Sequence, residues 1–306
     1  MWLKGPELCL SLLFIASYFT NKYVLSVLKF TYPTIFQGWQ TFVGSLLLQI
    51  AWKLGRVEMR SNVLWSAKVS WIPGALLFVG NIYAGSRALS KLPIPFFLLL
   101  QNTSEVVASI FLKITRKEKY SLTKFLSVVL VLIAAVSLPL NDPQGDKFLL
   151  HKFDSGGYFW AAIHCVCAGG CKVFQKLRSY SLSDVEQQYL NYLYSVVILM
   201  LTAHPSGDAF GALAFPFLSS YRFHSSCCAS AILGVSLMLV SVKMKSYLST
   251  VQYDMWMLLT KVLAALLSLV VFETLLNVST SCCLMLGVLG EALLVYAERN
   301  GAEMKG

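Results

Sequence analysis

Residues 255–271 read Met255-Trp256-Met257-Leu258-Leu259-Thr260-Lys261-Val262-Leu263-Ala264-Ala265-Leu266-Leu267-Ser268-Leu269-Val270-Val271, an apolar run with one lysine in it. A helix of about 20 such residues spans the hydrocarbon core of a bilayer. An ammonium group at that depth costs roughly 2.5–3.5 kcal/mol on insertion scales, so it usually faces a cavity or a partner. The stretch therefore predicts a transmembrane helix over 252–272, with Lys261 turned away from lipid.

Similar runs recur along all 306 residues, of which 57% are hydrophobic and only 13% are charged. Ordinary soluble domains carry roughly 25% charged residues, so the expected solvent is a lipid bilayer. The fold class that follows is all-α, a polytopic membrane protein of about ten transmembrane helices. The spans that we expect are 8–28, 33–52, 70–88, 94–112, 122–140, 157–175, 188–203, 225–242, 252–272 and 280–297.

The formal net charge of +10 has its source in the loops between these spans. With both termini in the cytosol, most of the 25 Lys and Arg residues fall on the cytosolic side, as the positive-inside rule expects. Lys22 and Lys261 are the two that this count assigns to neither side and leaves inside spans. We therefore expect a multi-pass protein with cytosolic termini and no nucleic-acid partner. The positive residues on the opposite side are Lys29, Arg87, Lys91, Lys147, Lys152 and Arg222.

The longest polar connection, about 141–156, lies near the centre of the chain and separates five spans from five. Because each half holds an odd number of spans, the second half must insert with the opposite orientation. Inverted repeats of this kind place the solute site of a transporter at the interface between the halves. The prediction is one transmembrane transporter domain over 1–306, with half-repeats of about 1–140 and 155–300.

Patterns for metal binding and catalysis are missing from the sequence. The eight cysteines fall in or beside apolar spans. Cys165, Cys167 and Cys171 lie near His164 but lack the paired spacing of zinc ligands, and small residues there suit helix packing. The loops carry no hydrolase or metalloprotease motif. We expect a protein that binds no metal or cofactor and is not an enzyme.

Polar residues within the spans are the candidates for binding a solute. Lys261 is the clearest, and its structural alternative is a pairing with Asp254, Glu105 or Glu291. Lysine can bind a phosphate, and amides can bind a nucleobase edge or sugar hydroxyls. For the amides, hydrogen bonding between helices is an equally weighted alternative. An aromatic ring can also stack on a base. The other candidates are Lys22, Asn21, Gln101, Asn102, Asn191, Ser241, Thr260, Tyr189 and Tyr253.

Two stretches resemble nucleotide-sugar transporters of the drug/metabolite transporter superfamily. Asn21-Lys22-Tyr23-Val24-Leu25, with Tyr32-Pro33 and Gln40 after it, resembles the first two spans of that family. Gly157-Tyr158-Phe159-Trp160 resembles the start of the sixth span in GDP-mannose transporters. The resemblance covers nearly the whole chain.

Motifs that bind the substrate in GDP-mannose transporters are kept only in part. The seventh-span motif Phe-Tyr-Asn-Asn, which contacts the base in that branch, reads Tyr189-Leu190-Asn191-Tyr192 here. The ninth-span motif Gly-Ala-Leu-Asn-Lys reads Met257-Leu258-Leu259-Thr260-Lys261, and the tyrosine four residues before it is kept as Tyr253. The fourth-span motif Phe-Lys-Asn-Leu-Thr reads Leu100-Gln101-Asn102-Thr103-Ser104. These departures weaken guanine recognition but keep a lysine for phosphate and a tyrosine for stacking.

The resemblance implies a Golgi transporter that moves UDP-N-acetylglucosamine from cytosol to lumen in exchange for UMP. A uracil base is smaller than guanine and needs fewer contacts to its edge, so a UDP-sugar is favoured over the runner-up, GDP-mannose. The alternative from another class is a membrane scaffold that has the transporter fold but does not transport. The expected partners are a nucleotide sugar, a nucleoside monophosphate, the lipid bilayer and a second copy in a homodimer.

Overall fold

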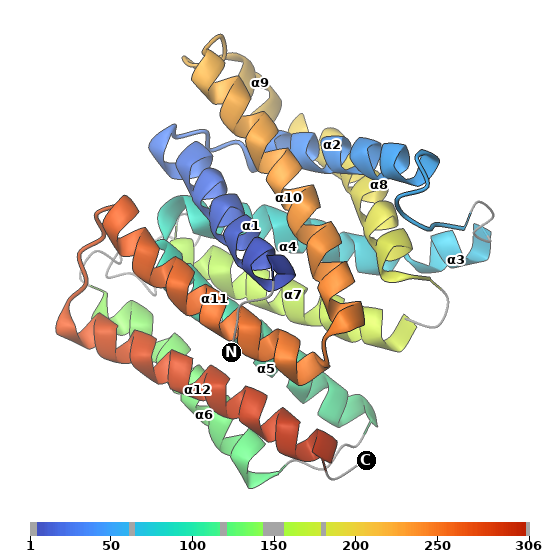
Figure 1. The fold of residues 1–306 in the computed structure, drawn as a ribbon. Coiled ribbons are helices and arrows are strands. Elements are labelled where there is room, and N and C mark those ends of the chain that lie inside the picture. Colours follow the sequence, from blue (N-terminus) through green and yellow to red (C-terminus); the bar gives the residue numbers. More distant parts are fainter. Residues whose placement is uncertain (1–4, 61–64, 117–120, 143–155, 179–181, 304–306) are drawn as a thin grey trace.

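The computed structural model describes residues 5–60, 65–116, 121–142, 156–178 and 182–303, and every regular element in these ranges is a helix (Figure 1). The first long helix continues into a π-helical turn, η1, and two short helices, α3 and α9, lie in connections. The bounds are α1 Gly5–Lys22, η1 Tyr23–Val27, α2 Pro33–Lys53, α3 Trp65–Ser70, α4 Ile72–Lys91, α5 Ile94–Arg116, α6 Leu122–Asn141, α7 Gly157–Arg178, α8 Asp184–Ala203, α9 Asp208–Leu213, α10 Tyr221–Tyr247, α11 Thr250–Val271 and α12 Val278–Glu303.

Each predicted span overlaps one of the long helices, and the all-α membrane class is confirmed. Within the described ranges, six helices are long and apolar enough to cross a membrane. The predicted polar connection falls largely on residues 143–155, which lie outside the described ranges. The six helices are Gly5–Val27, Ile94–Thr115, Leu122–Asn141, Tyr221–Tyr247, Thr250–Val271 and Val278–Asn300.

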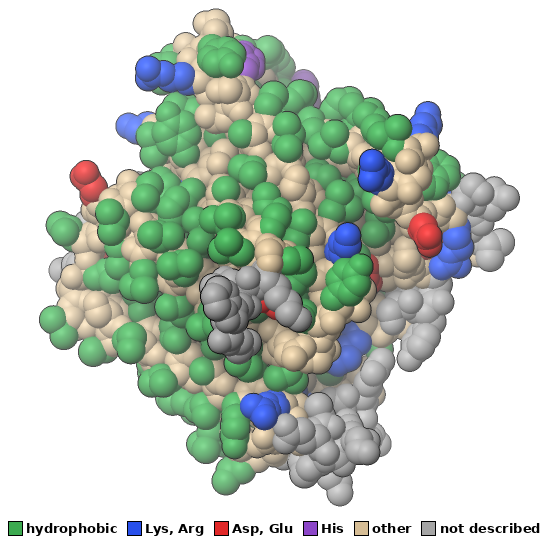
Figure 2. All heavy atoms as spheres, viewed as in Figure 1, with side chains coloured by type: hydrophobic (Ala, Val, Ile, Leu, Met, Phe, Trp, Pro, Cys, Tyr) green, Lys and Arg blue, Asp and Glu red, His purple; other side chains and the backbone are tan. Residues whose placement is uncertain are grey.

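Hydrophobic side chains cover most of the face of the molecule that Figure 2 shows, and charged side chains on it are few. Leu259, Leu266 and Val270 of α11 are examples of large apolar side chains that lie more than half exposed. Soluble monomers rarely expose contiguous apolar patches beyond a few hundred Å². A surface of this kind fits contact with lipid chains.

The helices α2, α4, α7 and α8 do not reach the apolar composition of the other six. They carry polar side chains such as Gln37 and Gln40 on α2, Arg87 on α4, Lys172 on α7 and Asn191 on α8. They also pack on one another, since α4 contacts α7, α8 and α2, and α2 contacts α8. Gln37 and Asn191 are accordingly buried between neighbouring helices.

Close packing between helices rests on glycine at several interfaces. A Cβ atom on Gly290 of α12 would lie 2.8 Å from Cγ2 of Val131 on α6, and Ser127 donates a hydrogen bond to the Gly290 carbonyl at 2.8 Å. A Cβ atom on Gly169 of α7 would lie 2.6 Å from Cγ1 of Val107 on α5. Small residues at such contacts are typical of membrane helix bundles.

One end of the bundle, where η1 ends and α2 begins, is filled by an aromatic cluster; we call it the α2 end. The ring of Phe30 lies 5.0 Å from that of Phe215 and 4.8 Å from that of Phe223, measured between centroids. Asp208 of α9 accepts hydrogen bonds from the backbone N–H of Thr34 at 3.1 Å and from its hydroxyl at 2.6 Å. These contacts hold α9 against the start of α2 and fill the α2 end with rings.

The opposite end, where α1 begins and α12 ends, holds the start of α11. There Trp256 Nε1 donates a hydrogen bond to the carbonyl of Glu7 at 2.9 Å. We call this the terminal end, since the described parts of the chain begin and finish there (Figure 1).

Candidate functional site

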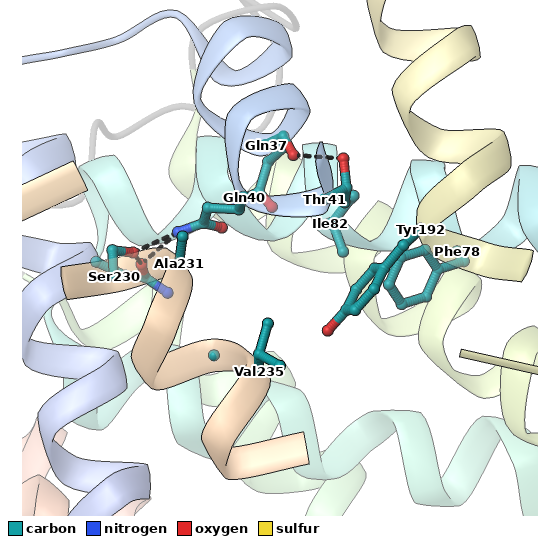
Figure 3. A pocket seen from close by; sticks show the side chains of 11 residues that line it. Gln37, Gln40, Thr41, Phe78, Ile82, Tyr192, Ser230, Ala231 and Val235 are labelled. Atoms are coloured by element: carbon teal, nitrogen blue, oxygen red, sulfur yellow. Dashed lines mark hydrogen bonds between the residues drawn. The ribbon is translucent and has the colours of Figure 1, made fainter. Parts of the chain in front are cut away.

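An inner pocket of about 130 Å³ lies between α1, α2, α4, α8 and α10 (Figure 3). One side of it is polar and the other is aromatic and aliphatic. Gln37, Gln40 and Thr41 share one face of α2 because residues three and four apart lie side by side on a helix. The residues that line the pocket are Asn21, Gln37, Gln40, Thr41, Phe78, Ile82, Tyr192, Ser230, Ala231, Gly234 and Val235.

The polar side of the inner pocket is held by hydrogen bonds that join four helices, α1, α2, α4 and α10. Gln40 Nε2 donates to Asn21 Oδ1 at 2.9 Å and to the hydroxyl of Ser230, and Ser230 donates in turn to Asn21 Oδ1. Gln37 Nε2 donates to Ser86 Oγ of α4 at 2.5 Å. Amide groups hold both donors and acceptors. The network can therefore rearrange to bind the polar edge of an uncharged ring or sugar.

The opposite side of the inner pocket is formed by Tyr192 of α8 and Phe78 of α4, whose ring centroids lie 6.1 Å apart at 63°. Figure 3 shows Tyr192 projecting into the pocket toward Val235 of α10. Gly44 of α2 makes room for this ring, because a Cβ atom there would lie 2.7 Å from Tyr192 Cε2. The pocket thus offers an aromatic surface facing amides.

A charged cluster lies at mid-helix and toward the terminal end: Glu105 of α5, Lys172 of α7, Lys245 of α10, and Asp254 and Lys261 of α11. Lys172 Nζ lies 2.5 Å from Glu105 Oε1, and the charge of Glu105 also interacts with those of Lys261 and Lys245. The side chains of Glu105 and Lys172 are 47% and 41% exposed. Lysines from three other helices, α7, α10 and α11, thus lie within electrostatic range of Glu105.

A triad of Asn102, Lys261 and Glu291 joins α5, α11 and α12. Lys261 Nζ donates to Glu291 Oε1 at 2.6 Å and to Asn102 Oδ1 at 2.8 Å. Asn102 Nδ2 donates to Glu291 Oε2 at 2.5 Å, so the three side chains close a ring of hydrogen bonds. Of the three acids named as alternatives for Lys261, Glu291 is the one in contact. Lys261 also lies within electrostatic range of Glu105 and Asp254.

Three predicted binding residues make hydrogen bonds between helices. Lys22 Nζ donates to the carbonyls of Leu89 and Leu92 at 2.8 and 2.9 Å, where a cation also complements the dipole of α4. Thr260 hydrogen-bonds Ser11 at 2.7 Å. The hydroxyl of Tyr18 donates to Gln101 at 2.8 Å in the same way. Of the other predicted residues, Asn21 lines the inner pocket and Lys261 belongs to the charged cluster.

The predicted tyrosines lie on either side of this region. Tyr253 lies beside the charged cluster, with Lys245 Nζ 5.3 Å from its ring centroid and the side chain of Ser241 near its hydroxyl. Tyr189 packs against the cluster of Leu48, Tyr192 and Val235 that forms part of the pocket wall. The structure therefore brings Tyr253 and Ser241 together, and Tyr189 is next to the pocket lining.

Asn191 lies behind the wall of the inner pocket, 1% exposed, with its Oδ1 accepting a hydrogen bond from Trp71 Nε1 at 2.9 Å. We expect Asn191→Leu to lower the melting temperature, because the buried Trp71 donor loses its partner at a cost of about 1–3 kcal/mol. The Kd for nucleotide should stay within about twofold. Titration calorimetry on the purified variant checks this. A Kd at least tenfold weaker, with an unchanged melting temperature, would instead establish the direct base contact that the motif predicts.

Five residues that line the inner pocket were not predicted from the sequence: Gln37, Gln40, Ser230, Phe78 and Tyr192. Gln37, Gln40 and Thr41 carried a usable signal, because they place three polar side chains on one face of a predicted span. The lower apolar content of the spans around 33–52 and 188–203 pointed to the same helices. Within the described ranges, no three His, Cys, Asp or Glu side chains lie together as metal ligands would.

No family model matches the chain. A Xenopus laevis protein described as "UDP-N-acetylglucosamine transporter TMEM241 homolog" is 55% identical over 304 residues, which cover 98% of this chain and 100% of that protein. The GDP-mannose transporter of Komagataella pastoris is 26% identical over 283 residues, or 91% of this chain and 84% of that protein. One solved crystal structure is 15% identical in sequence and aligns with a TM-score of 0.57 over 95% of this chain and 98% of the other chain. This likeness concerns the fold alone.

Proposed function

The chain belongs to the nucleotide-sugar transporter family, and from this premise we propose that it carries UDP-N-acetylglucosamine from the cytosol into the Golgi lumen. The relatives named for this sugar are 55% and 52% identical, whereas those named for GDP-mannose lie between 21% and 28%. GDP-mannose is therefore the second candidate. The relatives are named as transporters, and the chain is not an enzyme.

The observation that carries the choice of substrate is the inner pocket, with amides on one side and Tyr192 on the other. Pockets that hold a whole small ligand span roughly 300–1,000 Å³. At about 130 Å³ the inner pocket takes only one part of a nucleotide sugar. We assign it to the base, stacked on Tyr192 with its polar edge toward Gln40 and Asn21. Because Tyr192 narrows the pocket, the smaller uracil fits better than guanine.

We assign the diphosphate and sugar to the charged cluster, where Lys261 and Lys172 supply ammonium groups. Lysine binds phosphate as a point charge and keeps its donors free to follow the ligand. Tyr253, Ser241 and Tyr189 line the path between the charged cluster and the pocket in this proposal. Lys22, Gln101, Thr260 and Asn191 then support the site through the helix contacts described above.

Two properties of the membrane arrangement are proposed with the function: ten spans and inverted halves. The helices α2, α4, α7 and α8 are less apolar because they enclose a polar site, so their composition does not argue against crossing the membrane. With both termini in the cytosol, the aromatic cluster closes the luminal side and the charged cluster faces the cytosol. In this arrangement the carrier would load its substrate from the cytosol.

We further propose exchange with UMP, because the return of one anion for another limits the build-up of charge. Alternating access by rocking of the two halves provides the motion. A homodimer remains a prediction from the sequence.

A thermal-shift panel of nucleotide sugars on the purified protein in detergent tests the proposal. UDP-N-acetylglucosamine and UMP should raise the melting temperature, because a ligand that binds only the folded state stabilises it. GDP-mannose and GMP at equal concentration should raise it less. A larger shift with the guanosine compounds would select GDP-mannose, and a panel without any shift would favour the non-transporting scaffold.

A further inference from the structure

We propose that Glu291 acts as an internal anion that occupies Lys261 in the empty carrier, and that the diphosphate of the substrate displaces it. This inference rests on the proposed function and adds a role for a residue outside the substrate-binding motifs. Glu291 would set the affinity for nucleotide by competing for the same ammonium group.

The geometry of the triad is that of an occupied anion site. Glu291 presents both carboxylate oxygens, one to Lys261 Nζ at 2.6 Å and the other to Asn102 Nδ2 at 2.5 Å. The side chains of Lys261 and Glu291 are 18% and 10% exposed. An ammonium group this far from water needs a counterion, since a buried charge without a partner is strongly destabilising. When substrate is absent, Glu291 is that counterion.

Lys261 belongs to the charged cluster and is also in contact with Glu291. Its charge interacts with those of Glu105 and Asp254 as well as with the contacting carboxylate. An ammonium group carries three donors, and two of those of Lys261 are used by Glu291 and Asn102 among the described residues. A diphosphate bound in the cluster brings about two negative charges against one on Glu291. Since Coulomb attraction scales with charge, the lysine is drawn from the carboxylate toward the phosphates.

The surroundings of the triad allow this change of partner. A groove of about 250 Å³ borders all three side chains and is otherwise lined mostly by apolar residues of α5, α11 and α12, so the triad is not enclosed by close packing. Asn102 Nδ2 stays on Glu291 when Lys261 turns away, so the carboxylate keeps one hydrogen-bond donor. The same movement breaks the ion pair between α12 and α11, and binding of substrate would thereby loosen one contact that holds the empty carrier.

Glu291→Gln tests the competition, because it keeps the shape and the hydrogen-bonding capacity of the side chain and removes its charge. The Kd for UMP and for UDP-N-acetylglucosamine should fall about tenfold. This is the low end of the change in affinity expected from one hydrogen bond to a charged group. The melting temperature without ligand should also fall, because Lys261 loses its counterion. Titration calorimetry on the full chain in detergent gives the Kd. A purely structural pair would lower the melting temperature without tightening binding.

Two further variants complete the test. Glu273→Gln is the control, since Glu273 is an exposed carboxylate in the connection between α11 and α12, outside the charged cluster; its Kd should equal that of the wild type. Glu291→Asp keeps the charge on a shorter side chain and should bind between wild type and Glu291→Gln, which decides the matter if the glutamine variant does not fold. If both Glu291 variants bind nucleotide no more tightly than the wild type does, the competition is overturned and the proposed function still stands. A wild type that binds neither ligand overturns the proposed function and the competition together.

Discussion

Lys261→Gln is expected to reduce exchange of UDP-N-acetylglucosamine for UMP about 100-fold, the largest functional effect that we predict. The ammonium group is the proposed contact for the diphosphate, and a hydrogen bond to a charged group contributes about 1.5–3 kcal/mol. The same change leaves Glu291 buried without its counterion, at a cost of about 3–5 kcal/mol in unfolding free energy. Uptake into liposomes and the melting temperature of the purified variant measure the two effects.

The double variant Lys261→Gln/Glu291→Gln separates binding from folding. With both charges removed, the melting temperature should return close to that of the wild type, while exchange stays about 100-fold reduced. Lys243→Gln, an exposed lysine on α10 outside the charged cluster, is the control and should exchange normally. Wild-type exchange in the double variant would remove Lys261 from the site.

Tyr192→Ala is expected to weaken binding of UMP about 10- to 100-fold, since stacking of one base on an aromatic ring contributes about 1–3 kcal/mol. The loss should be smaller for GMP, because the widened pocket admits the larger base. The selectivity for uridine over guanosine nucleotides should therefore fall. Titration calorimetry with both monophosphates on the folded protein gives the two Kd values.

Two controls accompany the alanine variant. Tyr192→Phe keeps the ring and should stay within about threefold of the wild type. Tyr194→Ala removes a tyrosine two residues along α8 that packs beside the cluster of Trp71 and Leu190, away from the pocket, and should leave selectivity unchanged. An alanine variant at 192 with full selectivity for uridine would show that the base binds elsewhere.

The long helices could be predicted because apolar runs are a local property of the sequence. The predicted first and last residues of the helices were less accurate where capping decides where a helix begins or ends. The helix predicted over 188–203 begins earlier, at Asp184, because Ser183 and Glu186 form a capping box before the apolar run. The helix predicted over 225–242 extends over Tyr221–Tyr247, since its polar ends remain helical beyond the apolar core.

The site could be predicted where a residue is anomalous by itself. A lysine inside an apolar run identifies Lys261 without any structure, and Glu291 was among the three acids proposed for its pairing. The partner Asn102 lies 159 residues from Lys261 along the chain, so only packing brings them together. Likewise Gln40 and Ser230 are 190 residues apart, and neither is unusual within its own span. The inner pocket is therefore a property of the tertiary structure.

Exchange in reconstituted liposomes tests the central claim most directly. Liposomes that contain the purified protein and are preloaded with UMP should take up labelled UDP-N-acetylglucosamine rapidly, and liposomes loaded with buffer alone should take up little. Preloading with GMP should support less uptake of either UDP-N-acetylglucosamine or GDP-mannose. If neither monophosphate drives the uptake of either nucleotide sugar, the protein does not transport nucleotide sugars by exchange and the account fails.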